Sequence, residues 1–262
     1  MQIQTQPLTL NACDFRRLFA LFGPTLGFWR AAEIAAFRLY AEQMGGFERP
    51  ILDLGCGDGL VTSFVLPHVD VGLDPDANAL SHAARLDLYG RVEPVSMEAA
   101  GLPEGSIGTV ISNSVLEHAA HLDNALAASA RVLKPGGRLV FTVPTEAFSR
   151  WLAIPNAGYV ARRNRGFNHR NLWPVEEWAR RLERAGLQVE CVWPYLGAGW
   201  VRAWDALELI QQVRIGRGER LFARMWKRMP SAWYQALARR AARIDLSAPP
   251  PGGGRLISAR KI

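Results

Sequence analysis

The sequence predicts an α/β fold, with a doubly wound, mostly parallel sheet and helices on both faces. Between residues 50 and 143, short apolar runs alternate with longer stretches of helical spacing, which is typical of parallel strands joined by helices. A glycine-rich turn follows the first apolar run directly, at the edge where such sheets bind ligands. The chain has 262 residues, 49% hydrophobic and 21% charged, which is a globular composition.

Two helices are predicted before the sheet begins. The first covers 14–22, where apolar residues share one helical face, and Gly23-Pro24 breaks it. The second covers 25–44 and ends at Gly45-Gly46. We therefore expect an N-terminal helical cap over residues 1–46.

The core is predicted to span residues 47–195. Its predicted strands are 50–54, 69–74, 92–96, 107–112, 138–143 and 187–193, and its predicted helices are 60–66, 77–88, 121–133 and 174–185. Residues 145–173 are expected to be loop-rich, because the regular alternation pauses there.

The segment 196–253 is predicted to be a basic, tryptophan-rich helical insertion that forms a lid. It holds three amphipathic stretches, near 201–214, 218–229 and 231–245. Residues 200–262 carry 13 of the 31 Lys and Arg residues but only 4 of the 24 Asp and Glu residues. Residues 254–262 return to the core as its final strand, predicted at 255–261.

Composition excludes several classes of protein. The three cysteines form neither a disulfide framework nor a metal-binding pattern, so we expect a reducing compartment and assign no metal site. The uncharged runs are too short to span a bilayer, and the N-terminus lacks the basic region of a secretory signal. We expect a cytoplasmic protein; the sequence does not predict its oligomeric state.

The glycine-rich turn carries the most specific signal. It reads Asp53-Leu54-Gly55-Cys56-Gly57-Asp58-Gly59, and glycines there let a ligand approach the backbone at a helix N-terminus. A dinucleotide fold would place a glycine where Leu60 stands. A P-loop would end in Gly-Lys-Ser/Thr, which is absent. Both phosphate-binding interpretations are therefore disfavoured.

Acids recur at the ends of the first three strands. Asp74 follows Asp53 by 21 residues, the spacing at which an acid accepts hydrogen bonds from ribose hydroxyls. Met97-Glu98 follows the third strand, where an acceptor would meet an adenine amino group. Because the carboxyl ends of parallel strands share one edge, these acids are expected to face one crevice. They favour a positively charged nucleoside without phosphate.

Four motifs, ILDLGCGDG, VGLDPD, SNSVLEH and RVLKPGGRLVFTVP, in this order and spacing resemble class I S-adenosylmethionine-dependent methyltransferases, in the small-molecule, type 11-like branch. The resemblance implies a seven-stranded sheet whose last strand runs antiparallel between its neighbours, and S-adenosylmethionine as cofactor. It implies the following cofactor-binding residues: Asp53, Gly55, Cys56 and Gly57 around the methionine part, Asp74 and Pro75 at the ribose, Met97 and Glu98 at the adenine, and Asn113 and Ser114 beside the sulfonium.

Methyl transfer needs a base only where the acceptor loses a proton. We rank His169 first and His118 second as catalytic residues, with Tyr159 and Tyr195 behind them. Arg30 and Glu33, one helical turn apart, are expected to form a surface pair; alternatively, Arg30 meets the carboxylate of the cofactor.

The acceptor is expected to be a small or lipid-linked molecule methylated at oxygen, with nitrogen and carbon left open. Nucleic acid is disfavoured, because the [DN]PP[YF] motif of base N-methylation is replaced by Asn113-Ser114-Val115-Leu116. Two rivals remain: an RNA-modifying methyltransferase, and a non-catalytic cofactor-binding subunit that docks on a partner or membrane. Residues 214–245 are either a packed lid with a solvated basic side or a lid that also contacts an anionic membrane at its inner face.

Overall fold

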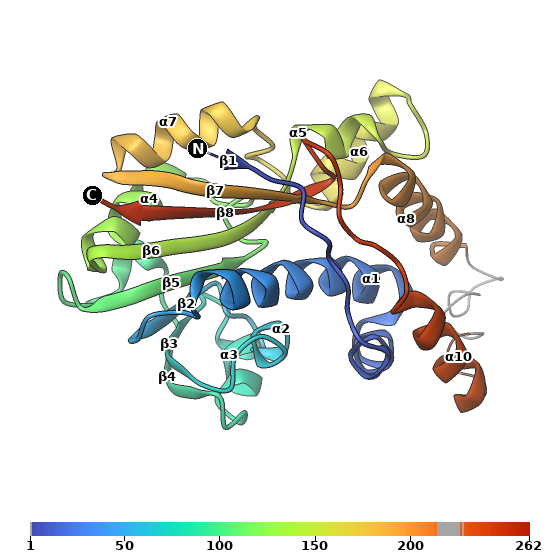
Figure 1. The fold of residues 1–262 in the computed structure, drawn as a ribbon, viewed down its shortest axis with the longest axis horizontal. Helices are drawn as coiled ribbons and strands as arrows, with labels where there is room; N and C mark the ends of the chain where they lie inside the picture. Colours follow the sequence, from blue (N-terminus) through green and yellow to red (C-terminus); the bar gives the residue numbers. More distant parts are fainter. Residues whose placement is uncertain (1, 214–225, 227) are drawn as a thin grey trace.

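The computed structural model describes residues 2–213, 226 and 228–262 and has one eight-stranded sheet, in the order β1-β7-β8-β6-β5-β2-β3-β4 (Figure 1). Its strands are β1 (Gln2–Ile3), β2 (Ile51–Leu54), β3 (Val69–Leu73), β4 (Tyr89–Glu93), β5 (Ile107–Asn113), β6 (Leu133–Pro144), β7 (Leu187–Tyr195) and β8 (Gly254–Lys261). The seven strands expected in the core are present, and the two-residue β1 adds an eighth at the edge of β7.

The predicted topology is confirmed. All pairings are parallel except those of β8, which runs antiparallel to both β6 and β7. The carboxyl ends of β2, β3 and β4, which the three predicted acids follow, therefore meet at one edge.

The helices are α1 (Ala12–Met44), α2 (Leu60–Ser63), α3 (Ala77–Ala83), α4 (Leu122–Val132), α5 (Glu146–Arg150), α6 (Ala157–Gly166), α7 (Val175–Arg184), α8 (Ala198–Gln211) and α10 (Ser231–Ala241), with a 3₁₀ turn at Met97–Ala99. The predicted break in α1 is a kink at Gly23, whose φ of 73° is left-handed, and Gly45, also left-handed, caps the helix. Within the described ranges, no helix is both long and apolar enough to cross a membrane.

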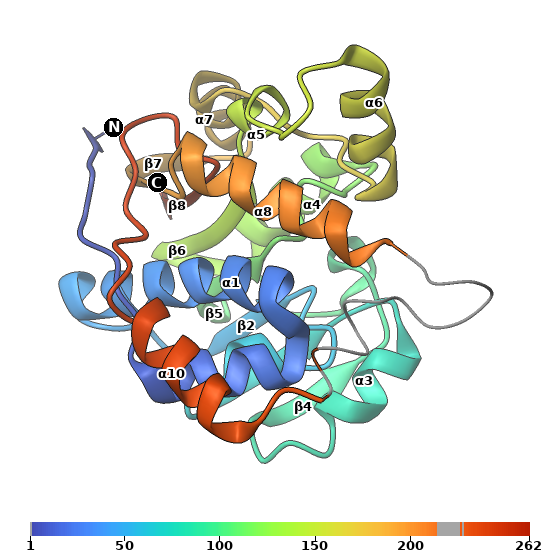
Figure 2. The ribbon, with the colours of Figure 1, turned by 90° about the vertical axis from the view of Figure 1, so that its right-hand side faces the viewer.

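Two apolar layers cover the two faces of the sheet. Successive strand residues point to opposite faces, so Ile51 joins the cluster built around α1, whereas Leu52 joins the cluster that includes Trp178 of α7 and Leu126 of α4. Figure 2 shows α10 lying against α1 on the first face. Within this layer, α1 also supplies Leu26, Trp29 and Arg30 to the wall of the candidate site.

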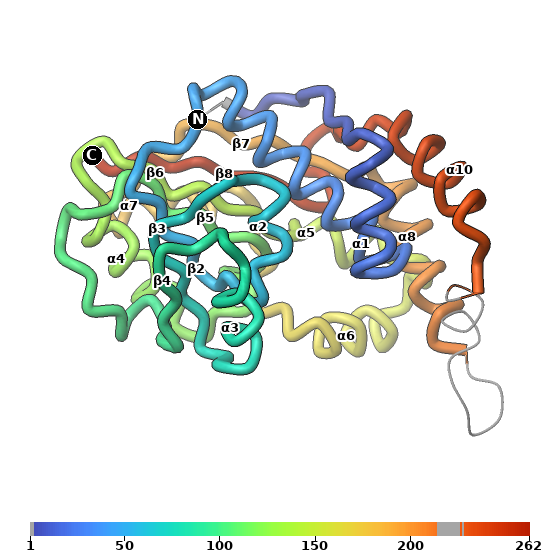
Figure 3. Tube along the Cα trace, turned by 90° about the horizontal axis from the view of Figure 1, so that it is seen from below, coloured from blue at the N-terminus to red at the C-terminus, as the bar shows by residue number. Residues whose placement is uncertain are grey.

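The expectation of a loop-rich segment at 145–173 is wrong, because α5 and α6 form within it. Local capping explains both helices: the side chain of Thr145 accepts from the Ala147 amide, and that of Asn156 accepts from the Tyr159 amide. Neither helix has a long apolar stripe, so periodicity does not reveal them. Figure 3 shows α5, α6, α8 and α10 gathered at the end of the molecule to which β6 leads.

The insertion contains α8 and α10, in agreement with two of its three predicted helices. The predicted helix at 218–229 lies almost entirely outside the described residues. A buried carboxylate joins α8 to α6: Asp205 accepts from the Ala153 amide at 2.8 Å, the Tyr159 hydroxyl at 2.7 Å and Arg163 Nε at 2.9 Å. Since both Arg163 and Asp205 are buried, this ion pair fixes how α8 of the predicted lid packs against α6.

We predict that Asp205→Ala lowers the free energy of unfolding by about 3–5 kcal/mol, because it leaves the buried Arg163 guanidinium without its carboxylate. Asp123→Ala is the matched control, since it breaks an ion pair with Arg181 whose Asp123 side chain is mostly exposed. Urea denaturation followed by circular dichroism measures both variants. Equal midpoints for the two variants would contradict the assigned role.

Candidate active site

The glycine turn and Asp74 form one rigid unit at the carboxyl ends of β2 and β3. Asp74 Oδ2 accepts the Gly57 amide at 2.9 Å, and Oδ1 accepts the Asp76 amide at 2.8 Å. Gly57 has a left-handed φ of 55°, and a Cβ there would meet no described atom within 4 Å. The turn therefore exposes backbone beside a fixed carboxylate, as close approach by a ligand requires.

Asp53 lies in β2, just before this turn, and its carboxylate connects the strand to Thr62 and Tyr89. Its carboxylate is 2% exposed and accepts from Thr62 Oγ1 at 2.6 Å and from the Tyr89 hydroxyl at 2.7 Å. Burial raises the pKa of Asp53 to about 6. Cys56 is also buried, against Leu80 and Ala83. Neither Asp53 nor Cys56 is among the described residues that line the neighbouring cavity.

A cavity of about 520 Å³ opens beside the turn, and we call it the strand-end cavity. It brings together the predicted Gly55, Pro75, Met97 and Glu98 with Leu116. No Lys or Arg in the described part of the chain lines it, whereas the carboxylate of Glu98 does. The cavity thus combines apolar walls with an acid, and it lacks the cations that a dinucleotide phosphate needs. These residues fit the adenosyl part of a cationic cofactor.

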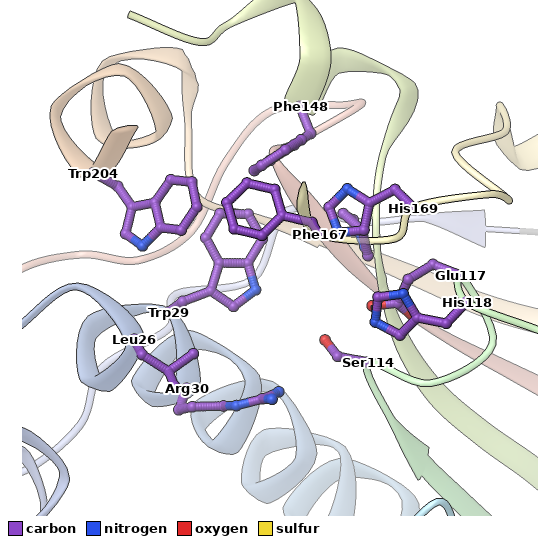
Figure 4. Close-up of a pocket in the computed structure, with 11 residues that line it drawn as sticks. Leu26, Trp29, Arg30, Ser114, Glu117, His118, Phe148, Phe167, His169 and Trp204 are labelled. Carbon is purple, nitrogen blue, oxygen red and sulfur yellow. The ribbon is translucent and has the colours of Figure 1, made fainter. Parts of the chain in front are cut away.

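A second cavity, of about 160 Å³, lies between α1, the end of β5 and the lid, and we call it the aromatic cavity (Figure 4). Its apolar lining includes Leu26, Trp29, Phe148, Phe167 and Trp204, and its polar lining is Arg30, Ser114, Glu117, His118 and His169. His118 lines both cavities. The two cavities therefore adjoin at His118.

The carboxylate of Glu33 links α1 to the end of β5. It is fully buried and accepts from Trp29 Nε1 at 3.0 Å, Arg30 Nη1 at 2.7 Å, Asn113 Nδ2 at 3.2 Å and the Ser114 hydroxyl. The expected surface pair of Arg30 and Glu33 is thus wrong: the pair forms, but inside the protein. Asn113 and Ser114 thus both contact α1; of the two, Ser114 lines the aromatic cavity, and Asn113 is not among the described residues lining either cavity.

Two further features mark this end of β5 and the helix opposite. Ser114 has a left-handed φ of 51°, which costs a non-glycine residue about 1 kcal/mol and is often found at functional sites. Arg30 Nε is buried without a hydrogen-bond partner among the described residues. Burial by itself lowers the pKa of Arg30, but the ion pair with Glu33 raises it overall, so this guanidinium stays charged beside the cavity.

The two predicted histidines lie side by side. The rings of His118 and His169 stack at 5.6 Å, and Phe167 stacks on His169 at 5.3 Å. Burial, assisted by His118, lowers the pKa of His169 to about 4. His118 Nδ1 lies 3.1 Å from the Asn168 carbonyl; because that oxygen only accepts, we assign the proton to Nδ1.

The tyrosines are placed differently from the histidines. Tyr159 donates to Asp205, and Tyr195 is fully buried, with a pKa that burial raises well above its usual value. Neither is among the described residues lining the two cavities, so the structure gives them no role in proton transfer.

Sequence reasoning missed most of the aromatic cavity. Trp29, Phe148, Phe167 and Trp204 come from four separate segments, and nothing in their spacing indicates that they meet. The resemblance placed Glu117 with His118 near the rim of the active site but gave it no catalytic role; in the structure it is buried and lines this cavity. One feature of the sequence could have indicated a role for Glu117: it stands next to His118 and close to the end of a predicted strand, as the acids of the three earlier strands do.

Comparison with known proteins places the chain in a family. A family model described as a methyltransferase domain matches residues 28–192. Ubiquinone biosynthesis O-methyltransferase from Cronobacter sakazakii is 30% identical over 131 residues, covering 47% of this chain and 54% of that protein. The protein of the same name from Nitrosococcus oceani is 29% identical over 144 residues, covering 50% and 61%. The chain thus spans little more than half the length of these relatives.

Solved structures share the fold. A SAM-dependent methyltransferase from Thermotoga maritima aligns with a TM-score of 0.58 and 14% identity, covering 95% of this chain and all of the other. Geranyl diphosphate C-methyltransferase from Streptomyces coelicolor, solved with S-adenosyl-L-homocysteine, aligns with a TM-score of 0.56 and 16% identity, covering 88% and 81%. The chain belongs to the methyltransferase-domain family, with the class I S-adenosylmethionine-dependent fold that its sequence predicts.

Proposed function

We propose that this chain transfers a methyl group from S-adenosylmethionine to oxygen on a small or lipid-linked acceptor. The observation that carries the proposal is the pair of adjoining cavities. The strand-end cavity has the walls and the acid that a nucleoside needs, the aromatic cavity is suited to an apolar or flat acceptor, and His118 lines both. Such an arrangement brings two ligands end to end, which methyl transfer requires.

The strand-end cavity would hold the donor. Asp74 would bind the ribose, Met97 and Glu98 the adenine, and the Gly55–Gly57 backbone the methionine part. When bound, S-adenosylmethionine supplies a methyl group already activated on a positively charged sulfur. The protein has to align the acceptor and exclude water. Arg30, whose Nε is free of a described partner, suits a carboxylate of the donor or an anionic group of the acceptor.

Two observations support the acceptor class. The relatives that the chain matches are named as O-methyltransferases, which favours oxygen. A third cavity, of about 290 Å³, is lined by apolar residues of α1, α8 and α10 and shares Trp204 with the aromatic cavity. A hydrophobic tail placed there would bury apolar surface while its head group occupies the aromatic cavity.

We predict that Asp74→Ala weakens binding of S-adenosylmethionine by about 10- to 100-fold, the loss expected when a carboxylate stops accepting hydrogen bonds from ribose. Isothermal titration calorimetry measures the affinity. Asp87→Ala is the matched control, because Asp87 is exposed, precedes β4 at the opposite edge of the sheet and lines neither cavity. Unchanged affinity in Asp74→Ala would remove this carboxylate from the donor site.

A second experiment identifies the acceptor class. Cell extract is incubated with methyl-labelled donor and either the wild type or Asp74→Ala, and the label is followed by mass spectrometry. We expect a labelled product in the small-molecule or lipid fraction with the wild type only. Label in RNA would favour the RNA-modifying rival, whereas an absence of product in every fraction, with donor still bound, would favour a non-catalytic subunit.

We also propose that α10 contributes to contact with an anionic membrane. Much of the predicted contact region, 214–245, lies outside the described residues, but within α10 Trp233 is 68% exposed, and exposed Arg239 and Arg240 follow it. Exposed tryptophan beside arginine is typical of helices that lie in a membrane interface.

Co-sedimentation with vesicles of phosphatidylglycerol tests this contact. We predict binding at low salt that Trp233→Ala weakens several-fold and that neutral vesicles do not support. Met44→Ala, which removes another exposed apolar side chain at the far end of α1, is expected to bind like the wild type. If intact protein stays in the supernatant at low salt, the membrane proposal is wrong.

A further inference from the structure

Glu117 is a buried acid that the proposed site has not yet used. It follows β5, is 1% exposed and lines the aromatic cavity together with Ser114 and His118, behind whose ring it lies in Figure 4. Its Oε2 atom is buried and has no hydrogen-bond partner in the described part of the chain. Leaving a buried polar atom unpaired is costly, so an oxygen of this kind at a cavity wall indicates a partner supplied by the ligand.

The backbone holds Glu117 in place. Its carbonyl oxygen accepts the amides of Arg170 at 2.9 Å and Asn171 at 3.0 Å. The side chain of Asn171 donates to the carbonyls of Leu116 and Ala119 on either side. These hydrogen bonds hold the loop that carries Glu117 in one position. A side chain that accepts a proton during a reaction has to be positioned in this way.

The charged and titratable groups around Glu117 favour its neutral form in the free protein. Glu33 of α1 and Tyr195 of β7 interact with it electrostatically, His118 Nε2 lies 3.7 Å from its Oε1, and His169 lines the same cavity. Burial, with a contribution from Glu33, raises the pKa of Glu117 to about 8. A backbone hydrogen bond, the charge of Arg30 and the nearby Ser114 hydroxyl act in the opposite direction. Glu117 therefore holds a proton far more tightly than an exposed carboxyl.

The histidines are weaker candidates for the same task. His169, with its pKa lowered to about 4, has little affinity for a proton at neutral pH. His118 presents only Nε2, since Nδ1 is engaged by the Asn168 carbonyl. A base with a pKa near the working pH is the more effective proton acceptor, which favours the carboxyl over the imidazole of His169.

We propose that Glu117 accepts the proton that the acceptor hydroxyl loses during methyl transfer, an inference that rests on the proposed O-methylation. The acceptor O–H bond breaks and its proton moves to Oε2 of the carboxylate. An electron pair of the acceptor oxygen forms the new bond to the methyl carbon, and the pair of the broken carbon–sulfur bond stays on sulfur. One positive and one negative charge disappear together, so the buried site keeps its net charge, as a region of low dielectric favours.

A second consequence concerns donor binding. A positive charge bound near Glu117 favours its carboxylate form, so binding of the cationic donor expels the proton, whereas the neutral demethylated product leaves it in place. Calorimetry at pH 7 in two buffers of different ionisation enthalpy counts released protons. We expect up to about one proton released with S-adenosylmethionine and none with S-adenosylhomocysteine.

Glu117→Gln completes the test. It is expected to abolish proton release, to weaken binding of S-adenosylmethionine but not of neutral S-adenosylhomocysteine, and to slow transfer of labelled methyl in cell extract by about 10²- to 10⁴-fold. Glu104→Gln, at an exposed position, is the matched control, and His169→Asn is expected to slow transfer much less. The wild-type measurement needs no variant, so equal proton release with donor and product would overturn the inference even if Glu117→Gln folded poorly.

The pH dependence of thermal stability tests the protonation of Glu117 without any ligand. Because folding raises the pKa of Glu117 from 4.5 to about 8, the folded state binds this proton more tightly than the unfolded state. The resulting stabilisation is present below pH 4.5 and is lost as the pH rises to about 8. Glu117→Gln should therefore reduce the fall in melting temperature between pH 6 and pH 9.

The outcomes separate the two proposals. Wild-type transfer rates in Glu117→Gln, or undiminished proton release, would reject Glu117 as the proton acceptor while leaving the methyltransferase assignment intact. Failure of the wild type to bind either adenosyl compound would reject the proposed function, and this inference with it.

Discussion

The carboxylate of Glu33 is the contact on which the candidate site depends. A fully buried acid is tolerated only when its oxygens are hydrogen-bonded, and Glu33 meets this condition through Trp29 and Arg30 on its own helix and through Asn113 and Ser114 at the end of β5. These bonds fix the distance between α1 and the sheet edge. The aromatic cavity occupies the space that they leave, so its shape follows from a polar contact rather than from apolar packing alone.

Charge explains the choice of ligand better than the glycines do. Among the described residues, the strand-end cavity is lined by the carboxylate of Glu98 and by no Lys or Arg, and Asp74 lies next to its Pro75. A positively charged donor balances this excess of acid at low dielectric, whereas a phosphate adds to it. The glycine turn permits a close approach of any nucleotide; the acids narrow the choice to a cation.

The sequence predicted the features that have a period or a fixed spacing. The parallel core and the break at Gly23 follow from such patterns, whereas the antiparallel direction of β8 was implied by the resemblance to the methyltransferase family. It did not predict α5 and α6, because capping by Thr145 and Asn156 is local and leaves no apolar period. The sequence also did not show that Glu33 is buried. The spacing of one helical turn predicts a pair with Arg30 whether that face of the helix is exposed or buried, and only the packing of α1 against the sheet decides between the two.

The most direct test of the central claim is a crystal structure with S-adenosylhomocysteine bound. We expect ribose hydroxyls within hydrogen-bond distance of the Asp74 carboxylate, adenine beside Met97, and sulfur facing the aromatic cavity near Ser114. A ligand in another part of the molecule would contradict the account. So would one bound at the strand edge with its sulfur directed away from Ser114, because the two cavities would then not serve one reaction.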